Sequence, residues 1–202
     1  VVLSNGSVAL AYQQGAPGVL EILGPDGTQV VGETTFEAGA TQYCSVVQAN
    51  NGTIFVFYKD FTDSGRGKFV RYQTDGTRLS AADPGQTVFE AGEVLYVCAA
   101  ALYNGNVVVA YRDDDDGGKG KFAIYDSSGN RVTSADPNQP VFHDGSTRYI
   151  SASLGSEGQF LIAYADSDDT NKGKAVVYSA NGVRTSGRNP DDPVFASQNG
   201  GC

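Results

Sequence analysis

A repeat of about 50 residues constrains the fold of this 202-residue chain more than any other feature. Gly6, Gly52, Gly105 and Gly158 each precede an apolar run that ends in a tyrosine six residues later: SVALAY, TIFVFY, NVVVAY and QFLIAY. The spacings between these glycines are 46, 53 and 53 residues. Such self-similarity is typical of architectures in which each repeat forms one supersecondary unit.

Each repeat contains about four segments with the composition of β-strands. The first run is followed by a second (GVLEIL, GKFVRY, GKFAIY and GKAVVY) and then by an Asp-Gly, Ser-Gly or Asn-Gly turn, in which glycine readily adopts a positive φ. A third stretch ends in TTF, TVF, PVF and PVF, and a fourth begins seven residues after Phe36, Phe89 and Phe142, at Tyr43, Tyr96 and Tyr149. The runs are too short for helices, so we predict an all-β fold.

Four antiparallel strands per repeat predict a β-propeller of four roughly 50-residue blades, with a β-sandwich as the main alternative. We place the repeats at approximately 1–42, 43–95, 96–148 and 149–202 of a single domain, residues 1–202. Cys202 stands seven residues after Phe195, where the other repeats have a tyrosine. We therefore expect the two termini to complete one blade jointly. Alternatively, the terminal strand completes the blade of another subunit, which builds a filament.

An acidic and then basic loop joins the first two strands of repeats two, three and four. Its sequences are YKDFTDSGRGK, YRDDDDGGKGK and YADSDDTNKGK, whereas the first repeat has YQQGAPG. The simplest interpretation is an exposed hairpin whose acids and bases offset one another. Exposed ion pairs of this kind stabilise by less than about 1 kcal/mol each.

The residues Asn104-Gly105, Tyr111, Asp113 to Gly117, Tyr125 and Ser128-Gly129, with their counterparts, resemble secreted β-propeller repeats of the FG-GAP and bacterial extracellular types. In FG-GAP repeats the acidic loop binds calcium, so the resemblance implies a possible Ca²⁺ site. Calcium requires six to eight oxygen ligands. The candidate ligands are Asp113, Asp115 and Asp116 in one loop and Asp166, Asp168 and Asp169 in the next. Two lysines in the same loop, Lys119 and Lys121, compete with a metal for these carboxylates.

Charge and processing signals bear on the partners and the location. The net charge of −9 excludes a nucleic-acid partner, which requires a basic face, and no apolar run approaches the roughly 18 residues of a membrane span. The chain contains no methionine and begins at Val1, as expected of a processed or partial sequence. Asn5-Gly6-Ser7 and Asn51-Gly52-Thr53 match the N-glycosylation pattern. We predict a secreted or cell-surface glycoprotein modified at Asn5 and Asn51.

The three cysteines lie in equivalent strands of their repeats. One hypothesis is a Cys44–Cys202 disulfide that fastens the closure of the ring. Buried free thiols are the alternative, because an odd number of cysteines does not settle the pairing.

Catalysis is not indicated. The only histidine, His143, occupies a predicted loop in the slot that Glu90 holds in the preceding repeat, and we expect it on the surface. The loop acids recur in several repeats, whereas an active site is usually one asymmetric constellation. A carboxylate-based hydrolase is therefore the less favoured hypothesis.

We expect a non-enzymatic binding, adhesion or assembly module whose partner is an extracellular glycan, an extracellular protein or copies of itself. Tyr58, Tyr111 and Tyr164 are predicted to pack in the core. Alternatively, the recurring tyrosines stack on sugars, which makes the protein a multivalent lectin.

Overall fold

The computed structural model describes residues 1–82, 85–134, 138–156, 158–186 and 193–196. All regular secondary structure in these ranges is β-strand, which confirms the all-β prediction. The same ranges contain no helix with the length and apolar character needed to cross a membrane.

Thirteen strands follow one another along the described chain. They are β1 (Val8–Gln13), β2 (Gly18–Leu23), β3 (Gln29–Glu37), β4 (Thr41–Gln48), β5 (Ile54–Asp60), β6 (Arg66–Tyr72), β7 (Thr87–Ala101), β8 (Val107–Asp113), β9 (Lys119–Tyr125), β10 (Val141–Leu154), β11 (Gln159–Asp166), β12 (Lys172–Ser179) and β13 (Val194–Ala196). The apolar runs that end in Tyr12, Tyr58, Tyr111 and Tyr164 lie in β1, β5, β8 and β11. The second apolar run of each repeat lies in β2, β6, β9 and β12.

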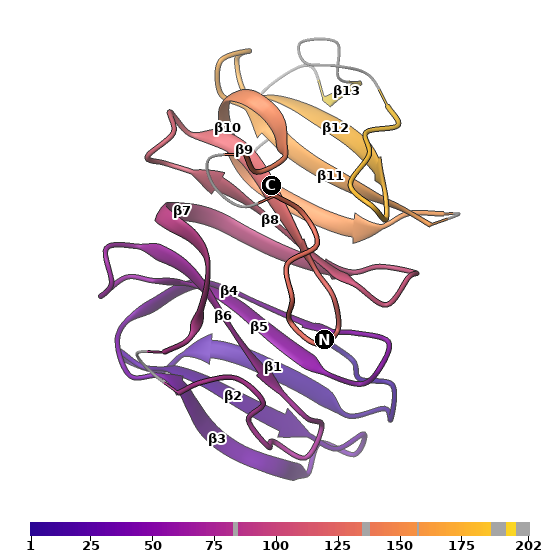
Figure 1. Cartoon of the computed structure of the whole chain (residues 1–202). Helices are drawn as coiled ribbons and strands as arrows, with labels where there is room; N and C mark the ends of the chain where they lie inside the picture. The colour runs from indigo at the N-terminus through magenta and orange to yellow at the C-terminus, as the bar shows by residue number, and fades with distance from the viewer. Residues whose placement is uncertain (83–84, 135–137, 157, 187–192, 197–202) are drawn as a thin grey trace.

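Two long strands connect successive repeats. The first half of β7 pairs with β6 and its second half pairs with β8, with the change of partner between Glu93 and Val94. Strand β10 changes partner in the same way, from β9 at Ser146 to β11 at Thr147. Each long strand is therefore the last strand of one repeat and the first strand of the next. Figure 1 shows the resulting succession of sheets, from β1–β3 at the bottom to β11–β13 at the top.

This sharing produces one ten-stranded antiparallel sheet from β4 to β13, while β1, β2 and β3 form a separate three-stranded sheet. Repeats two to four thus each contain four strand segments. Among the described strands, β13 pairs only with β12 and β1 pairs only with β2, so no pairing joins the two ends of the chain. The predicted joint blade depends on Cys202 and its neighbours, which lie outside the described residues.

A repeated contact in the core explains two of the sequence motifs. The rings of Phe36, Phe89 and Phe142, from the TTF, TVF and PVF motifs, lie directly on Gly18, Gly67 and Gly120. A Cβ atom at Gly120 would lie 2.3 Å from the ring of Phe142. The glycine that opens the second run is therefore required by packing, because any side chain there would displace the phenylalanine.

Candidate functional site

The loops β5–β6, β8–β9 and β11–β12 lie at one end of the strands, and each contains a buried cluster of ion pairs. In the first, Nζ of Lys68 lies 2.7 Å from Oδ2 of Asp60 and 2.9 Å from Oδ2 of Asp63. The same arrangement recurs with Lys121 between Asp113 and Asp116, and with Lys174 between Asp166 and Asp169. The acids and bases of the loop do pair, as the sequence indicated.

The prediction of an exposed hairpin is wrong for the inner members of these clusters. Asp60 and Lys68 are both 2% exposed, and their counterparts are buried as well. Burial opposes ionisation of Asp60, but hydrogen bonds from Lys68, Thr62 and the backbone of Asp63 hold the pKa of Asp60 below its usual value. Burial likewise opposes the charge of Lys68, yet hydrogen bonds to Asp60 and Asp63 raise the pKa of Lys68. The hairpin buries these groups because each charge has a partner.

The loop geometry does not favour the calcium that the resemblance implies. Asp113 and Asp116 point at the ammonium group of Lys121, at 2.7 Å and 2.8 Å, so a cation of the protein already takes these oxygens. Asp115 is separate from the pair and accepts a hydrogen bond from the backbone N–H of Glu93 at 3.1 Å. The carboxylates of Asp113 and Asp116 thus converge on a lysine, and calcium binding stays a prediction.

A second layer of polar side chains lies beneath the loops. Glu90 is buried and its carboxylate accepts hydrogen bonds from the Tyr111 hydroxyl at 3.0 Å, the Gln139 amide at 2.6 Å and the Gly92 backbone at 3.1 Å. Glu37 accepts the equivalent bonds from Tyr58 and Gln86. These bonds connect adjacent repeats. They also confirm the prediction that Tyr58, Tyr111 and Tyr164 belong to the core, where all three are buried.

His143 occupies the third position of this layer, and its predicted place on the surface is wrong. The side chain is 3% exposed because β10 pairs His143 with Gly120 and the ring packs on Tyr164, with centroids 5.0 Å apart. Nδ1 lies 3.2 Å from the Tyr164 hydroxyl. Nε2 lies 3.1 Å from Oδ1 of Asp166 without forming a hydrogen bond.

A row of three partly exposed tyrosines runs across the first strands of repeats two, three and four. Tyr43 lies on β4, Tyr96 on β7 and Tyr149 on β10, and we call them the tyrosine row. Neighbouring rings are tilted by 52° and 55°, with centroids 5.5 Å and 5.6 Å apart. Tyr43 is 39% exposed and Tyr149 is 61% exposed. The row is therefore a contiguous aromatic surface that crosses three repeats.

The backbone of the row is strained at each tyrosine. Their φ angles are 51°, 54° and 51°, in the left-handed region that residues with a Cβ rarely adopt. Each lies at an irregularity in the strand pairing, where the register skips between Gln42 and Ser45, between Leu95 and Cys98, and between Arg148 and Ser151. Bulges of this type redirect side chains, often beside functional sites. Here they leave the rings of Tyr43 and Tyr149 exposed, while Tyr96 between them is partly buried against the core.

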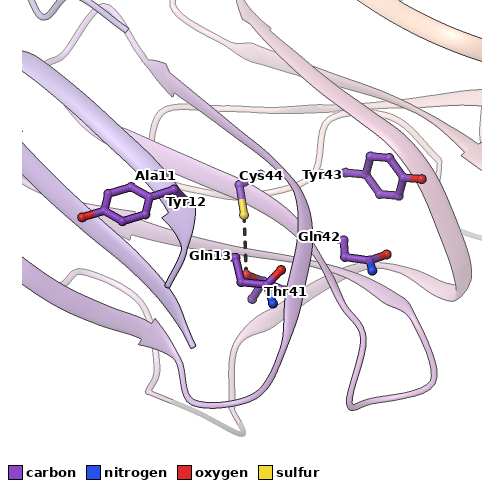
Figure 2. A pocket seen from close by; sticks show the side chains of 7 residues that line it. All are labelled: Ala11, Tyr12, Gln13, Thr41, Gln42, Tyr43 and Cys44. Atoms are coloured by element: carbon purple, nitrogen blue, oxygen red, sulfur yellow. Dashed lines mark hydrogen bonds between the residues drawn. The ribbon is translucent and has the colours of Figure 1, made fainter. Parts of the chain in front are cut away.

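The row ends beside a pocket of about 530 Å³ between β1 and β4. The pocket is lined by Ala11, Tyr12, Gln13, Thr41, Gln42, Tyr43 and Cys44, and Figure 2 shows Tyr12 and Tyr43 at its two sides. Burial raises the pKa of Tyr43, and the nearby Tyr96 and Glu93 add to that shift. The pocket and the row together give this face both apolar rings and amide groups.

The other predicted sites are placed as follows. Asn5 and Asn51 lie exposed on equivalent turns, where each side-chain oxygen accepts the backbone N–H two residues later. Their glycosylation stays a prediction. Cys44 and Cys98 are free thiols, and burial raises the pKa of Cys44. The proposed partner of Cys44, Cys202, lies outside the described residues.

From the sequence, Tyr43, Tyr96 and Tyr149 were predicted only to begin a strand. Their recurrence seven residues after a phenylalanine was the available signal, but it does not distinguish a buried ring from an exposed one.

Comparisons with known proteins give a fold without a family. No family model matches the chain, and neither does any curated protein. Among solved structures, the chain is similar to the BP39L lectin from Burkholderia pseudomallei (14% identity, 92% of this chain and 52% of the lectin, TM-score 0.64). It is also similar to an ulvanlyase of polysaccharide lyase family PL25 (13%, 91% and 56%, TM-score 0.61). A third similar structure is the NanB sialidase from Streptococcus pneumoniae (11%, 91% and 30%, TM-score 0.60).

The similarity extends over most of this chain but over about half or less of each of these structures. At such low identity it supports the all-β architecture alone.

Proposed function

We propose that this chain is a non-catalytic, extracellular carbohydrate-binding module, and that the tyrosine row is its binding surface. In this proposal the four repeats form the blades of a β-propeller. The observation that carries the proposal is the recurrence of a positive-φ tyrosine, exposed or partly exposed, at the same bulge in three consecutive repeats.

Strain of this kind has to be offset elsewhere in the fold. A residue with a Cβ in the left-handed region costs about 1–2 kcal/mol, and such residues cluster at ligand-contacting sites. The exposed rings of Tyr43 and Tyr149 recover little of that cost by burial. Three successive strained tyrosines are therefore better explained by a ligand than by stability.

The chemistry of the surface suits a sugar chain. An aromatic ring presents a flat apolar face, on which the C–H side of a pyranose stacks, and the tyrosine hydroxyl donates or accepts hydrogen bonds. Gln42 and Arg148, each exposed and adjacent in sequence to a row tyrosine, add polar groups. A row that crosses three repeats favours an extended oligosaccharide over a single monosaccharide.

The similar solved structures support the same class of ligand, since they include a lectin and two proteins named for their action on glycans. A non-catalytic role is supported by the loop carboxylates. Those of Asp60, Asp113 and Asp166 are each held by a lysine, so they are poorly suited to act as a general acid or a nucleophile.

The test is a broad glycan array followed by calorimetry on the best ligand, using Tyr149→Gly and Tyr96→Gly. Glycine removes the ring and accepts the positive φ, so a loss of binding cannot be attributed to backbone strain. Tyr103→Ala is the matched control, because Tyr103 is also exposed but lies in the turn between β7 and β8. We expect at least a tenfold loss for each glycine variant and no change for the control. A wild-type protein that is silent across the array overturns the proposal, and so do glycine variants that bind normally.

A further inference from the structure

We propose that the β11–β12 loop of the last repeat forms a binding site for a late first-row transition-metal ion, with Zn²⁺ as the reference ion, held by His143, Asp166 and Asp168. The site opens into a pocket of about 410 Å³ that these three residues line together with Asp144, Asp169 and Lys174. This proposal does not depend on the tyrosine row.

The three donor atoms are already close together. One ligand atom from each of the three residues lies within 4.8 Å of the others. The two carboxylates are held by backbone groups: Oδ1 of Asp166 accepts the N–H of Asp168 at 3.0 Å, and Oδ2 of Asp168 accepts the N–H of Ser146 at 2.8 Å. Such outer contacts orient metal ligands before the ion binds. Small side-chain movements bring the donors to the distances of about 2.0–2.2 Å that zinc requires.

The imidazole supplies the independent evidence for a ligand. Nε2 of His143 is buried and is one of the few buried polar atoms in the described residues that lack a hydrogen bond. It faces Oδ1 of Asp166 at 3.1 Å, while Nδ1 is engaged by the hydroxyl of Tyr164. If the ring proton is on Nδ1, two lone pairs face each other across that gap. A cation between them removes the repulsion and gives the imidazole nitrogen a partner.

The preceding repeats show why the site belongs to the last one. Beside the loop of repeat three, the place of His143 is taken by Glu90 from the end of repeat two, whose carboxylate is satisfied by three hydrogen bonds from Gly92, Tyr111 and Gln139. In repeat two the equivalent of Asp168 is Thr62, whose hydroxyl donates to Asp60 and has no charge to offer a metal. Among the loops of the described repeats, only β11–β12 combines an imidazole nitrogen that lacks a hydrogen bond, Nε2 of His143, with a second carboxylate, that of Asp168.

Charge and ligand type determine which ion fits. Four carboxylates line the pocket against one cation, Lys174, which binds Oδ2 of Asp166 at 2.7 Å. Oδ1 of Asp166 accepts the backbone N–H groups of Asp168 and Asp169 and is the oxygen that faces the imidazole. An imidazole ligand favours zinc, nickel or copper, whereas calcium and magnesium prefer oxygen ligands throughout. Three protein ligands leave a coordination position open toward the pocket.

The experiment uses the full chain without a polyhistidine tag. Calorimetry with ZnCl₂ is expected to give one saturable site, which Co²⁺ occupies with visible absorption bands. Because His143 is the only histidine, its ¹⁵N imidazole signals are assigned without ambiguity. We expect Zn²⁺ to shift the Nε2 signal and to leave Nδ1 protonated. His143→Gln and Asp168→Asn should each weaken Zn²⁺ binding at least tenfold. Asp115→Asn, the same change in the loop of repeat three, should leave it unaltered.

The proposal is overturned by any of three results. The first is the absence of a saturable Zn²⁺ site, and the second is equal weakening by Asp115→Asn. The third is full competition by millimolar CaCl₂, which indicates an ordinary acidic surface. If His143→Gln does not fold, the imidazole signals of the unmodified protein decide the question, because their failure to move during the titration excludes His143 as a ligand.

Discussion

Two sets of tyrosines recur with the same 53-residue spacing, and the structure gives them opposite roles. Tyr58, Tyr111 and Tyr164 are buried in β5, β8 and β11, each packed on a phenylalanine with ring centroids 5.0–5.2 Å apart. The tyrosine row lies on the neighbouring strands β4, β7 and β10, partly exposed and with positive φ. The hydroxyl of each buried tyrosine contacts Glu37, Glu90 or His143 of an adjacent repeat.

Recurrence of a tyrosine in the sequence therefore does not tell whether the residue serves the core or a binding surface. The buried set combines packing with satisfied hydrogen bonds, and this is what stability requires. The tyrosine row combines backbone strain with incomplete burial, and both lower stability. We attribute its recurrence to ligand binding by the rings. Substitutions in the two sets should therefore have effects of opposite sign on stability.

The largest effect is expected for Tyr111→Ala. It removes a ring packed on Phe89 and a donor to Glu90, so the free energy of unfolding should fall by about 3–5 kcal/mol, as for other buried aromatic residues. Urea unfolding followed by fluorescence measures this. Tyr111→Phe keeps the ring and should lose about 1–2 kcal/mol. An alanine variant as stable as wild type would show that the two sets do not differ in this way.

A smaller effect is expected for Gly120→Ala, which tests the packing beneath the buried set. The new Cβ would lie 2.3 Å from Phe142, the ring on which Tyr164 packs. Overpacking of this kind costs about 1–3 kcal/mol. Gly32→Ala, where the nearest atom of a neighbouring side chain is 3.6 Å from the new Cβ, is the control. The melting temperature should fall for the first variant and stay within error for the second, and equal shifts would contradict the packing argument.

Tyr149→Gly should change stability in the opposite direction from Tyr111→Ala, or not at all. Relief of the left-handed strain, about 1–2 kcal/mol, is partly offset by the backbone entropy of glycine, about 0.5–1 kcal/mol. We expect the free energy of unfolding to stay constant or to rise by up to about 1 kcal/mol. A loss above 2 kcal/mol, measured by urea unfolding, would place Tyr149 with the buried set.

The pH dependence of stability should report the buried ion pairs of the loops. Burial opposes the ionisation of Asp60 and Asp166, but their hydrogen bonds and neighbouring charges, those of Lys68 and Lys174 foremost, together hold both pKa values below the usual value. Their contribution is present above the unfolded-state pKa of about 3.9 and is lost as the pH falls through the folded-state value. The pKa values of Lys68 and Lys174 are raised. The stability that these two lysines contribute is therefore present below their unfolded-state pKa and is lost as the pH rises above about 10.5. Thermal melts should show a plateau between about pH 5 and 10. A decline that begins near pH 6 would contradict this assignment.

The smallest effect concerns calcium. Because Lys121 already binds the carboxylates of Asp113 and Asp116, millimolar CaCl₂ should leave the melting temperature of the metal-free protein unchanged. A protein that binds calcium only when folded is stabilised by it, so a clear rise with CaCl₂ would restore the calcium prediction.

Much of the fold could be predicted from local patterns. Apolar runs bounded by glycine-containing turns became β5, β6, β8, β9, β11 and β12 almost residue for residue. The paired charges of the loop were also predicted, because Asp113 and Lys121 are brought together by a single hairpin. The burial of those charges was not predicted, since it depends on strands from elsewhere in the chain that cover them.

The repeat, the strand order and the all-β class follow from the sequence alone, because apolar patterning and turn chemistry act within a few residues. The tertiary structure was needed to show which tyrosines lie in the core and which form the tyrosine row. It was also needed to show that His143 is buried. The physical reason is that burial and hydrogen-bond partnership depend on groups far apart in the chain. The Glu37 carboxylate, for example, receives its donors from Tyr58 and Gln86, 21 and 49 residues away. A positive φ at Tyr96 likewise follows from the mismatch between two paired strands, which no single segment of the sequence contains.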